Sequence, residues 1–337
     1  MTLQENISLK KFNTFGIDVK AEYFAEVSEI NELLELLNSS EIKNQPFLFL
    51  GGGSNILFTA DFKGVVIKLA IPGIVIIDED RSTILVEAGA GVVWHDLVQF
   101  CVNKNFGGIE NLSLIPGTAG AAPIQNIGAY GQEIKDVFES LSGYYLQDGA
   151  AGNFYKDNCR FGYRDSIFKR ELKGKFIITK IRLRLSKDPV LNLSYGQVKQ
   201  EVEKLNLKEL TVKDVSRIIC SIRKSKLPDP SIDGNAGSFF KNPEISFEKF
   251  SGLQKEFPDI PGYTQEKSVK LAAGWLIEKC GWKGKRVGNS GSHSKQALVL
   301  VNYGGASGKE VLQLAGEIKS SVYKKFGIML EEEVNII

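Results

Sequence analysis

The chain has 337 residues, with 42 Lys or Arg, 40 Asp or Glu and only 2 His, and a formal net charge of +2. This charge balance argues against a nucleic-acid partner, because such a protein carries a strongly basic stripe. Two histidines leave little material for a histidine-built metal site or a Ser-His-Asp triad. At roughly 150 residues per domain the length predicts two to three domains. Glycine, with 34 residues, exceeds its usual share of about 7%.

The cysteines and the hydropathy pattern indicate an intracellular protein. Cys101, Cys159, Cys220 and Cys280 are widely spaced and form no Cys-x-x-Cys pair. This spacing argues against a zinc ribbon and against a secreted disulfide framework. Residues 1–12 lack the apolar core of a signal peptide, and no stretch reaches the ~18 apolar residues of a membrane span. We therefore expect a cytoplasmic protein with no membrane partner and no metal.

The first seventy or so residues predict mixed α and β structure. An apolar stripe over residues 30–37 predicts a helix, and residues 46–50 and 64–69 read as short buried strands. Pro72-Gly73 is a turn dipeptide and a candidate boundary.

The next region, residues 74–227, is rich in strand signals. It predicts strands at 83–87 and 176–185, and helices at 93–101 and 212–226. Between them lies a long glycine-rich stretch, residues 106–132, with few periodic signals.

The third region opens at Pro228 and Pro230, which predict a stiff linker. We expect a helix over 268–280, a strand over 297–301, a helix starting at Ser307, and a terminal strand over 328–337 that returns to the first domain. The expected domains are residues 1–73 completed by 319–337, then 74–227, then 228–318.

Two short glycine motifs permit more than one interpretation. Gly51 to Asn55 directly follows a buried strand, and its glycines suit either a phosphate-binding nest or a plain tight turn. No Gly-Lys-Ser/Thr follows, and Ile56 occupies the third glycine position of a dinucleotide fingerprint. Gly89-Ala90-Gly91 also lacks the third glycine, which favours a structural turn.

The segment from Ile115 to Gly131 is harder to interpret as a simple connection. A loop of this length inside a compact domain is usually functional or disordered. Its apolar residues Ile115, Ile124 and Ile127 argue against disorder. We therefore expect this loop to wrap a large, flat ligand.

Five long motifs, in a fixed order, carry a resemblance. They are the Gly51 loop, the Ile115–Gly131 loop, Phe161-Gly162-Tyr163-Arg164-Asp165-Ser166, the string from Gly234 to Pro243, and Lys270-Leu271-Ala272-Ala273-Gly274-Trp275. With these motifs the chain resembles the UDP-N-acetylenolpyruvoylglucosamine reductases (UDP-N-acetylmuramate dehydrogenases) over essentially its whole length. The Tyr195-Gly196 and Tyr263 segments resemble the longer subclass of that family.

The resemblance implies an α+β flavin fold of the FAD-binding PCMH-like, vanillyl-alcohol-oxidase type, with two FAD-binding lobes and a C-terminal α+β substrate domain. It implies reduction of UDP-N-acetylglucosamine enolpyruvate to UDP-N-acetylmuramate by NADPH through FAD, in peptidoglycan precursor synthesis. The implied partners are this UDP-sugar and NADPH, and the expected state is a monomer. The protein must hold the flavin, stabilise an enolate and supply a proton.

The resemblance also implies catalytic roles for Ser238, Arg164 and Glu333. Ser238 matches the family's proton donor, although a serine beside a glycine is more often a turn or a cap. Arg164 matches the arginine that faces the substrate carboxylate, and its alternative role is an ion pair with Asp165. Glu333 matches the catalytic glutamate. If the run 331–333 were an extended strand, Glu331 and Glu333 would share one face.

Binding roles follow from the same resemblance. Ala121 and Ala122 stand where some relatives have serines, so we expect only backbone amides to act as donors there. The positions matching substrate contacts are Tyr195, Lys226, Asn242, Tyr263 and Gln296. The positions matching cofactor contacts are Gly51, Gly52, Gly53, Ser54, Asn55, Ile115, Pro116, Gly117, Gly120, Ala121, Ala122, Gln125, Asn126, Ile127, Gly128 and Tyr163.

Two other functions stay open on the sequence alone. One is a different FAD-dependent oxidoreductase of the same fold, which would have no need of a proton-donating serine. The other is a UDP-sugar-binding protein without catalysis, which would bind no flavin.

Overall fold

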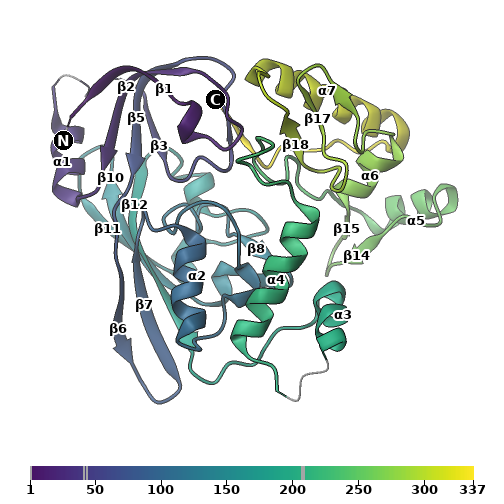
Figure 1. The fold of residues 1–337 in the computed structure, drawn as a ribbon, viewed down its shortest axis with the longest axis horizontal. Coiled ribbons are helices and arrows are strands. Elements are labelled where there is room, and N and C mark those ends of the chain that lie inside the picture. Colours follow the sequence, from purple (N-terminus) through teal and green to yellow (C-terminus); the bar gives the residue numbers. More distant parts are fainter. Residues whose placement is uncertain (1, 41, 43–44, 206–208) are drawn as a thin grey trace. The chain divides into compact units, whose positions relative to one another are not determined.

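The computed structural model describes residues 2–40, 42, 45–205 and 209–337, which form two compact units (Figure 1). The first unit comprises the described residues within 1–7, 21–52 and 63–225. The second comprises residues 8–20, 53–62 and 226–337. The finer division into three domains stays a prediction.

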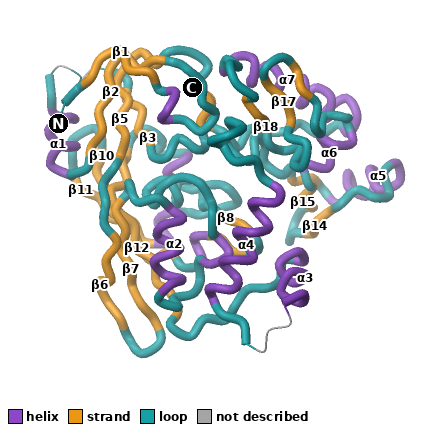
Figure 2. The backbone as a smooth tube through the Cα atoms, viewed as in Figure 1, coloured by secondary structure: helices purple, strands orange, loops and turns teal. Residues whose placement is uncertain are grey.

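The described residues of the first unit form two larger β-sheets and the two-stranded sheet β8-β9, and strands appear in orange in Figure 2. The four-stranded sheet has the order β1-β2-β5-β3, with β1 Gln4–Ser8, β2 Lys20–Val27, β3 Phe47–Leu50 and β5 Phe62–Leu69. The five-stranded sheet has the order β11-β10-β12-β7-β6, with β6 Ile74–Glu79, β7 Thr83–Gly89, β10 Phe138–Tyr145, β11 Ala151–Tyr155 and β12 Phe176–Ser186. Every neighbouring pair in the second sheet is antiparallel.

Helices and a loop complete the apolar core against the five-stranded sheet. Trp94 and Leu97 of one helix are buried in this core together with Ala119, Ala122 and Ile127 of the predicted ligand loop. The ligand loop is therefore packed and ordered. The helices of this unit are α1 Ile30–Asn38, α2 Trp94–Asn103, α3 Gly196–Leu205 and α4 Val212–Lys226, with the short strands β8 Gly128–Ala129 and β9 Gln132–Glu133. Its 3-10 helices are η2 Glu110–Leu112, η3 Ile134–Asp136, η4 Lys156–Cys159 and η5 Ile167–Lys169.

The described residues of the second unit form small sheets, three α-helices and a short 3-10 helix. Its strand orders are β13-β15-β14, β16-β17-β18 and β19-β4. The strands are β4 Ile56–Leu57, β13 Glu244–Ile245, β14 Gly262–Thr264, β15 Val269–Leu271, β16 Arg286–Val287, β17 Ser290–Ser292, β18 Leu300–Asn302 and β19 Asn335–Ile336. The helices are η1 Lys10–Phe12, α5 Phe247–Glu256, α6 Ala273–Lys279 and α7 Gly308–Phe326.

Several predicted elements are confirmed and three differ from the prediction. The strand expected over 297–301 is regular only over 300–302, because residues 297–298 form a turn. The helix predicted over 212–226 is α4, and Ser307 caps α7 through its hydroxyl. The helix expected over 268–280 is instead a strand followed by a short helix, because Val269 and Leu271 alternate with Lys270 and pair with strands on both sides. The terminal strand expected over 328–337 is regular only at 335–336, because the chain bends at residues 333–334.

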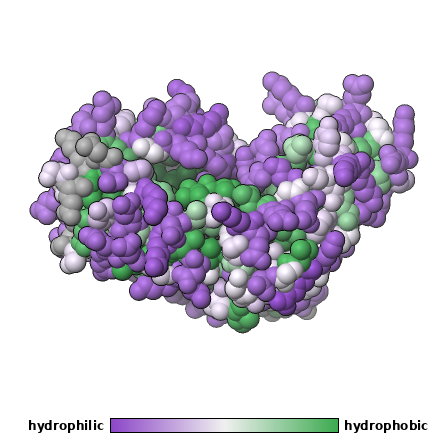
Figure 3. Space-filling view, turned by 90° about the horizontal axis from the view of Figure 1, so that it is seen from above, coloured by the Kyte–Doolittle hydropathy of each residue, from purple (hydrophilic) through white to green (hydrophobic). Residues whose placement is uncertain are grey.

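Among the described residues, no helix is long and apolar enough to cross a membrane. Hydrophilic side chains cover most of the face seen in Figure 3.

Candidate functional site

In the first unit, the Gly51 turn lies directly against the Ile115–Gly131 loop. A Cβ added to Gly52 would lie 2.9 Å from the Cα of Gly117, and one added to Gly51 would lie 2.5 Å from the Oγ1 of Thr118. Real Cβ atoms essentially never approach other atoms this closely, so a side chain at position 52 would push two backbones apart, and one at position 51 would displace the Thr118 hydroxyl. The structure therefore brings together two of the segments that the sequence matched to flavin binding.

Both segments present backbone amides that the protein itself does not use. Within the described part of the chain, the amides of Gly52, Gly53 and Ser54 donate no hydrogen bond, and the same holds for Gly117 and Thr118. Successive unpaired N–H groups in a turn form a concavity suited to an anion. The residues present thus fit the diphosphate of a flavin dinucleotide, which favours the nest over the plain turn at residues 51–55.

Ala121 and Ala122 behave differently from the expectation. Their amides both donate to the carbonyl of Thr118, each at 3.1 Å. The methyl group of Ala122 is buried in the apolar core. These two bonds within the turn count against the expectation that the same amides donate to the cofactor, which stays a prediction.

Asn126 anchors the ligand loop from the inside. Its side chain is fully buried, and its Nδ2 donates to the carbonyl of Gly162 at 2.9 Å and to Oε2 of Glu133 at 3.0 Å. Its Oδ1 accepts from the amide of Lys135 at 3.2 Å. Because Gly162 belongs to the Tyr163-Arg164 turn, Asn126 ties that turn to the ligand loop.

Arg164 is presented by a tight turn between Gly162 and Asp165, whose backbones exchange hydrogen bonds at 3.0 and 3.3 Å. Arg164 has a φ of +53°, an unfavourable value for a residue with a side chain. Its Nη2 donates to the carbonyl of Gly128 at 2.6 Å, and its guanidinium lies 5.2 Å from the ring centre of Tyr163. The turn thus aims a cation along the edge of the ligand loop.

Arg170 is the ion-pair partner of Asp165. The Nη2 of Arg170 lies 2.6 Å from Oδ2 of Asp165, and Oδ1 of Asp165 accepts from the amide of Ser166. The ion pair with Asp165, which was the alternative role considered for Arg164, is thus made by Arg170.

In the second unit, Ser238 lies on an extended segment bonded on both sides. The amide of Phe239 donates to the carbonyl of Leu298 at 2.9 Å, and its carbonyl accepts from the amide of Glu333 at 2.8 Å. Gly237, with a φ of +69°, turns the chain into this segment. Ser238 is half-buried, and no hydrogen bond joins its hydroxyl to another described residue. The backbone is therefore held while the hydroxyl stays uncommitted within the described protein.

The three glutamates at 331–333 have separate environments. Glu331 pairs with Lys241 at 3.2 Å, and Glu332 pairs with Lys319 at 2.8 Å. The chain bends after residue 332, which breaks the alternation expected of a strand. The strand argument that put Glu331 and Glu333 on one face therefore does not apply. Glu333 instead packs beside the Ser238 segment through its backbone.

The predicted substrate residues of the second unit fall into three places. Oδ1 of Asn242 accepts from the amide of Ala273, and Oε1 of Gln296 would lie 3.0 Å from a Cβ on Gly274, so both residues lie at the start of α6. Tyr263, which is 57% exposed, is paired across β14 and β15 with Lys270. Lys226 is the last residue of α4.

Arg223 is a candidate residue that the sequence analysis missed. Its Nε donates to the carbonyl of Leu114 at 3.2 Å, and it hydrogen-bonds the Tyr130 side chain. Burial lowers its pKa, and no carboxylate pairs with it in the described ranges. A signal existed in the sequence, because Arg223 lies three residues before Lys226 on one face of a helix.

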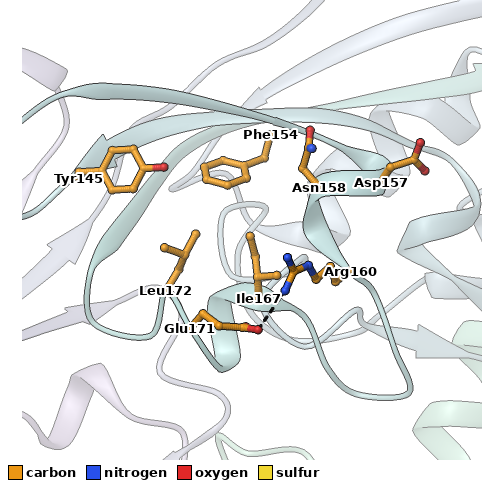
Figure 4. Close-up of a pocket in the computed structure, with 8 residues that line it drawn as sticks. All are labelled: Tyr145, Phe154, Asp157, Asn158, Arg160, Ile167, Glu171 and Leu172. Atoms are coloured by element: carbon orange, nitrogen blue, oxygen red, sulfur yellow. Dashed lines mark hydrogen bonds and ion pairs between the residues drawn. The ribbon is translucent and has the colours of Figure 1, made fainter.

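A cavity of about 490 Å³ lies apart from all these residues (Figure 4). An ion pair of 3.2 Å between the exposed side chains of Arg160 and Glu171 spans one side of it. Its lining contains no predicted site residue and consists of Tyr145, Phe154, Asp157, Asn158, Arg160, Ile167, Glu171 and Leu172. The cavity is thus lined by residues that precede and follow Arg164 in the sequence, and it is not the candidate site.

Comparisons with known proteins agree with this arrangement. Residues 21–155 match the family model described as "FAD binding domain", and residues 229–337 match "UDP-N-acetylenolpyruvoylglucosamine reductase, C-terminal domain". The reductase of that name from Pseudomonas aeruginosa is 49% identical over 100% of this chain and 99% of the relative, and that from Amoebophilus asiaticus is 50% identical over 100% of both. The crystal structure of the Thermus caldophilus reductase is 25% identical, covers 99% of each chain and superposes with a TM-score of 0.68.

Proposed function

The chain belongs to the UDP-N-acetylenolpyruvoylglucosamine reductase family, and we propose that Ser238, Arg164 and Glu333 are its catalytic residues. It has the FAD-binding PCMH-like fold with the C-terminal domain of this family. It reduces the enolpyruvyl group of UDP-N-acetylglucosamine enolpyruvate to UDP-N-acetylmuramate, in peptidoglycan precursor synthesis, with FAD and NADPH. FAD, when bound, supplies the hydride that it takes from NADPH.

Ser238 is proposed to give a proton to the substrate carbon next to the carboxylate. Its hydroxyl makes no hydrogen bond to another described residue, and the backbone of the next residue, Phe239, is hydrogen-bonded to Leu298 on one side and to Glu333 on the other. A serine hydroxyl is a weak acid, so the transfer requires a strongly basic carbanion and a site from which water is excluded. The fixed backbone limits the positions that the hydroxyl can take.

Arg164 is proposed to stabilise the negative charge that develops on the substrate carboxylate. Its Nη2 donates to the carbonyl of Gly128, at the edge of the loop matched to flavin binding. A positive charge placed beside the substrate carboxylate would stabilise the negative charge as it develops there in the transition state. Glu333 is proposed as the carboxylate of the site, held through its amide against Phe239.

The proposed cofactor contacts divide by chemistry. The amides of residues 52–54 and of Gly117 and Thr118 would hold the diphosphate, while Gly120, Ala121 and Ala122 would contact the flavin only through their surfaces. The remaining predicted contacts keep their proposed roles. They are Gly51, Asn55, Ile115, Pro116, Gln125, Asn126, Ile127, Gly128 and Tyr163.

Tyr195, Lys226, Asn242, Tyr263 and Gln296 are proposed to bind the UDP-sugar. The protein is proposed to act as a monomer in the cytoplasm, where NADPH is available, and to belong to the longer subclass on the strength of its Tyr195 and Tyr263 segments.

The observation that carries the proposed mechanism is the Ser238 hydroxyl, and the test separates the two half-reactions. Ser238→Ala should leave reduction of the flavin by NADPH nearly unchanged and slow its reoxidation by substrate roughly 10²-fold or more, the scale of a lost general acid. Ser231→Ala, on an exposed turn of the same unit, is the matched control and should change neither rate. Equal losses in both half-reactions would show that Ser238 is structural.

A further inference from the structure

The loop that carries Tyr195 is joined to the end of the ligand loop by the buried side-chain amide of Asn111. Nδ2 of Asn111 donates to the carbonyl of Tyr130 and to the carbonyl of Asn192, both at 2.9 Å. Asn111 is 1% exposed. Because its two donors engage two different loops, neither loop can shift without breaking one of these bonds.

Asn192 makes a second tie in the same place. Its Nδ2 donates to the carbonyl of Gly131 at 2.9 Å. Its Oδ1 accepts from the amide and the hydroxyl of Ser194, at 3.1 and 2.6 Å. The side-chain oxygen of Asn192 thus holds the turn that leads to Tyr195, and its side-chain nitrogen joins that turn to the ligand loop.

The aromatic ring of Tyr195 rests on the loop so fastened. It meets the ring of Tyr130 edge to face, with centroids 5.2 Å apart and planes at 84°. Tyr130 itself has a φ of +50°. A non-glycine residue in this conformation costs about 1 kcal/mol or more and persists where its surroundings hold it.

Asn111 has a feature that stability does not explain. Its Oδ1 is buried and has no hydrogen-bond partner within the described structure. An unpaired buried acceptor is destabilising, so an apolar side chain would serve the core better. An asparagine is useful at this position because its side-chain nitrogen can donate to two carbonyls at once, those of Tyr130 and Asn192.

We propose that Asn111 and Asn192 are positioning residues that set Tyr195 according to the state of the flavin-binding loop. The inference rests on the proposed function in which Tyr195 contacts the UDP-sugar and the 115–131 loop contacts FAD. FAD bound against that loop holds it in place, and the loop holds Tyr195 in place through the latch, which we define as Asn111, Asn192 and the carbonyls of Tyr130 and Gly131. Affinity for the UDP-sugar therefore depends on flavin occupancy, and by linkage the reverse is also true.

Two variants of Asn192 separate the latch from the turn. Asn192→Ala removes both functions of the side chain, whereas Asn192→Asp keeps the acceptor for Ser194 and loses the donor to Gly131. Both should raise the KM for the UDP-sugar roughly 3- to 10-fold, the effect of one net hydrogen bond. Flavin reduction by NADPH and the visible flavin spectrum should stay unchanged. Asn153→Ala, an exposed asparagine of β11, is the control.

A binding measurement tests the coupling without turnover. Calorimetric titration of the UDP-sugar into flavin-free and FAD-loaded protein should show tighter binding to the loaded wild type. The ratio of the two affinities should fall toward one in both Asn192 variants. An Asn192→Asp variant that behaves like wild type in KM and in this ratio would overturn the latch.

Tyr195→Ala distinguishes failure of the latch from failure of the proposed function. If it leaves the KM unchanged, Tyr195 does not bind the UDP-sugar and the proposed function is wrong at that residue. If it raises the KM while both Asn192 variants do not, the substrate role stands and the latch is refuted.

Discussion

Substitution of Gly52 by alanine tests whether close packing of the two glycine-containing loops is what permits flavin binding. The new Cβ would lie 2.9 Å from the Cα of Gly117 and 3.4 Å from its carbonyl carbon. Carbon atoms in ordinary contact lie about 3.5–4.0 Å apart, so the two backbones would have to separate by about 0.6 Å or more. Both sides of the contact are backbone, so no flexible side chain can absorb this change.

Overpacking of this kind costs about 1–3 kcal/mol. In flavin-free protein the loops can relax apart, whereas bound flavin requires them to come together again. We therefore expect the Kd for FAD to rise by a factor of about 5 to 150, given about 1.4 kcal/mol for each tenfold change. Fluorescence titration of flavin-free protein with FAD measures this Kd.

Gly316→Ala is the matched control. Gly316 lies on the exposed side of α7, and a Cβ there would meet no atom within 4 Å. The same chemical change should stabilise the protein by about 0.5–1 kcal/mol and leave the Kd for FAD unchanged. A Gly52→Ala protein that binds FAD as tightly as wild type would refute the steric reasoning.

Three further outcomes follow from the same structure. Asn126→Ala removes three hydrogen bonds from a buried site, one of them to a carboxylate, and should lower the free energy of unfolding by about 3–5 kcal/mol in urea denaturation; a loss under 1 kcal/mol would contradict this. Burial lowers the pKa of His95 below 6.5, and its neutral Nδ1 accepts from the amide of Leu114. Below pH 6.5 the unfolded chain therefore takes up a proton at His95 that the folded protein does not, so the free energy of unfolding decreases as the pH is lowered. Unfolding of His95→Gln at pH 7.5 and 5.5 should show a smaller loss than wild type, and an equal loss would exclude His95 as a source. Burial raises the pKa of Cys101 and of Cys159 to about 12, so a maleimide at pH 8 should label both only after denaturation, as peptide mass spectrometry can check.

Elements with local signals were predicted well. The helix over 212–226 was predicted with its observed bounds, and Ser307 with Glu310 forms the capping box that starts α7. The helix predicted over 268–280 was wrong, because apolar spacing near Val269 suits a strand equally well. Pairing with β14, which directly precedes it, and with β13, which lies further back in the chain, decided the outcome.

The sequence by itself determined the family and the reaction, because these follow from long motifs in a fixed order. It left open whether Arg164 was committed to Asp165 and how the three glutamates at 331–333 divided their roles. The tertiary structure decided both, since Arg170 takes Asp165 and lysines 241 and 319 take two of the glutamates. The physical reason is that an ion pair depends on which side chains the fold brings within a few ångströms, and adjacency along the chain does not report this distance.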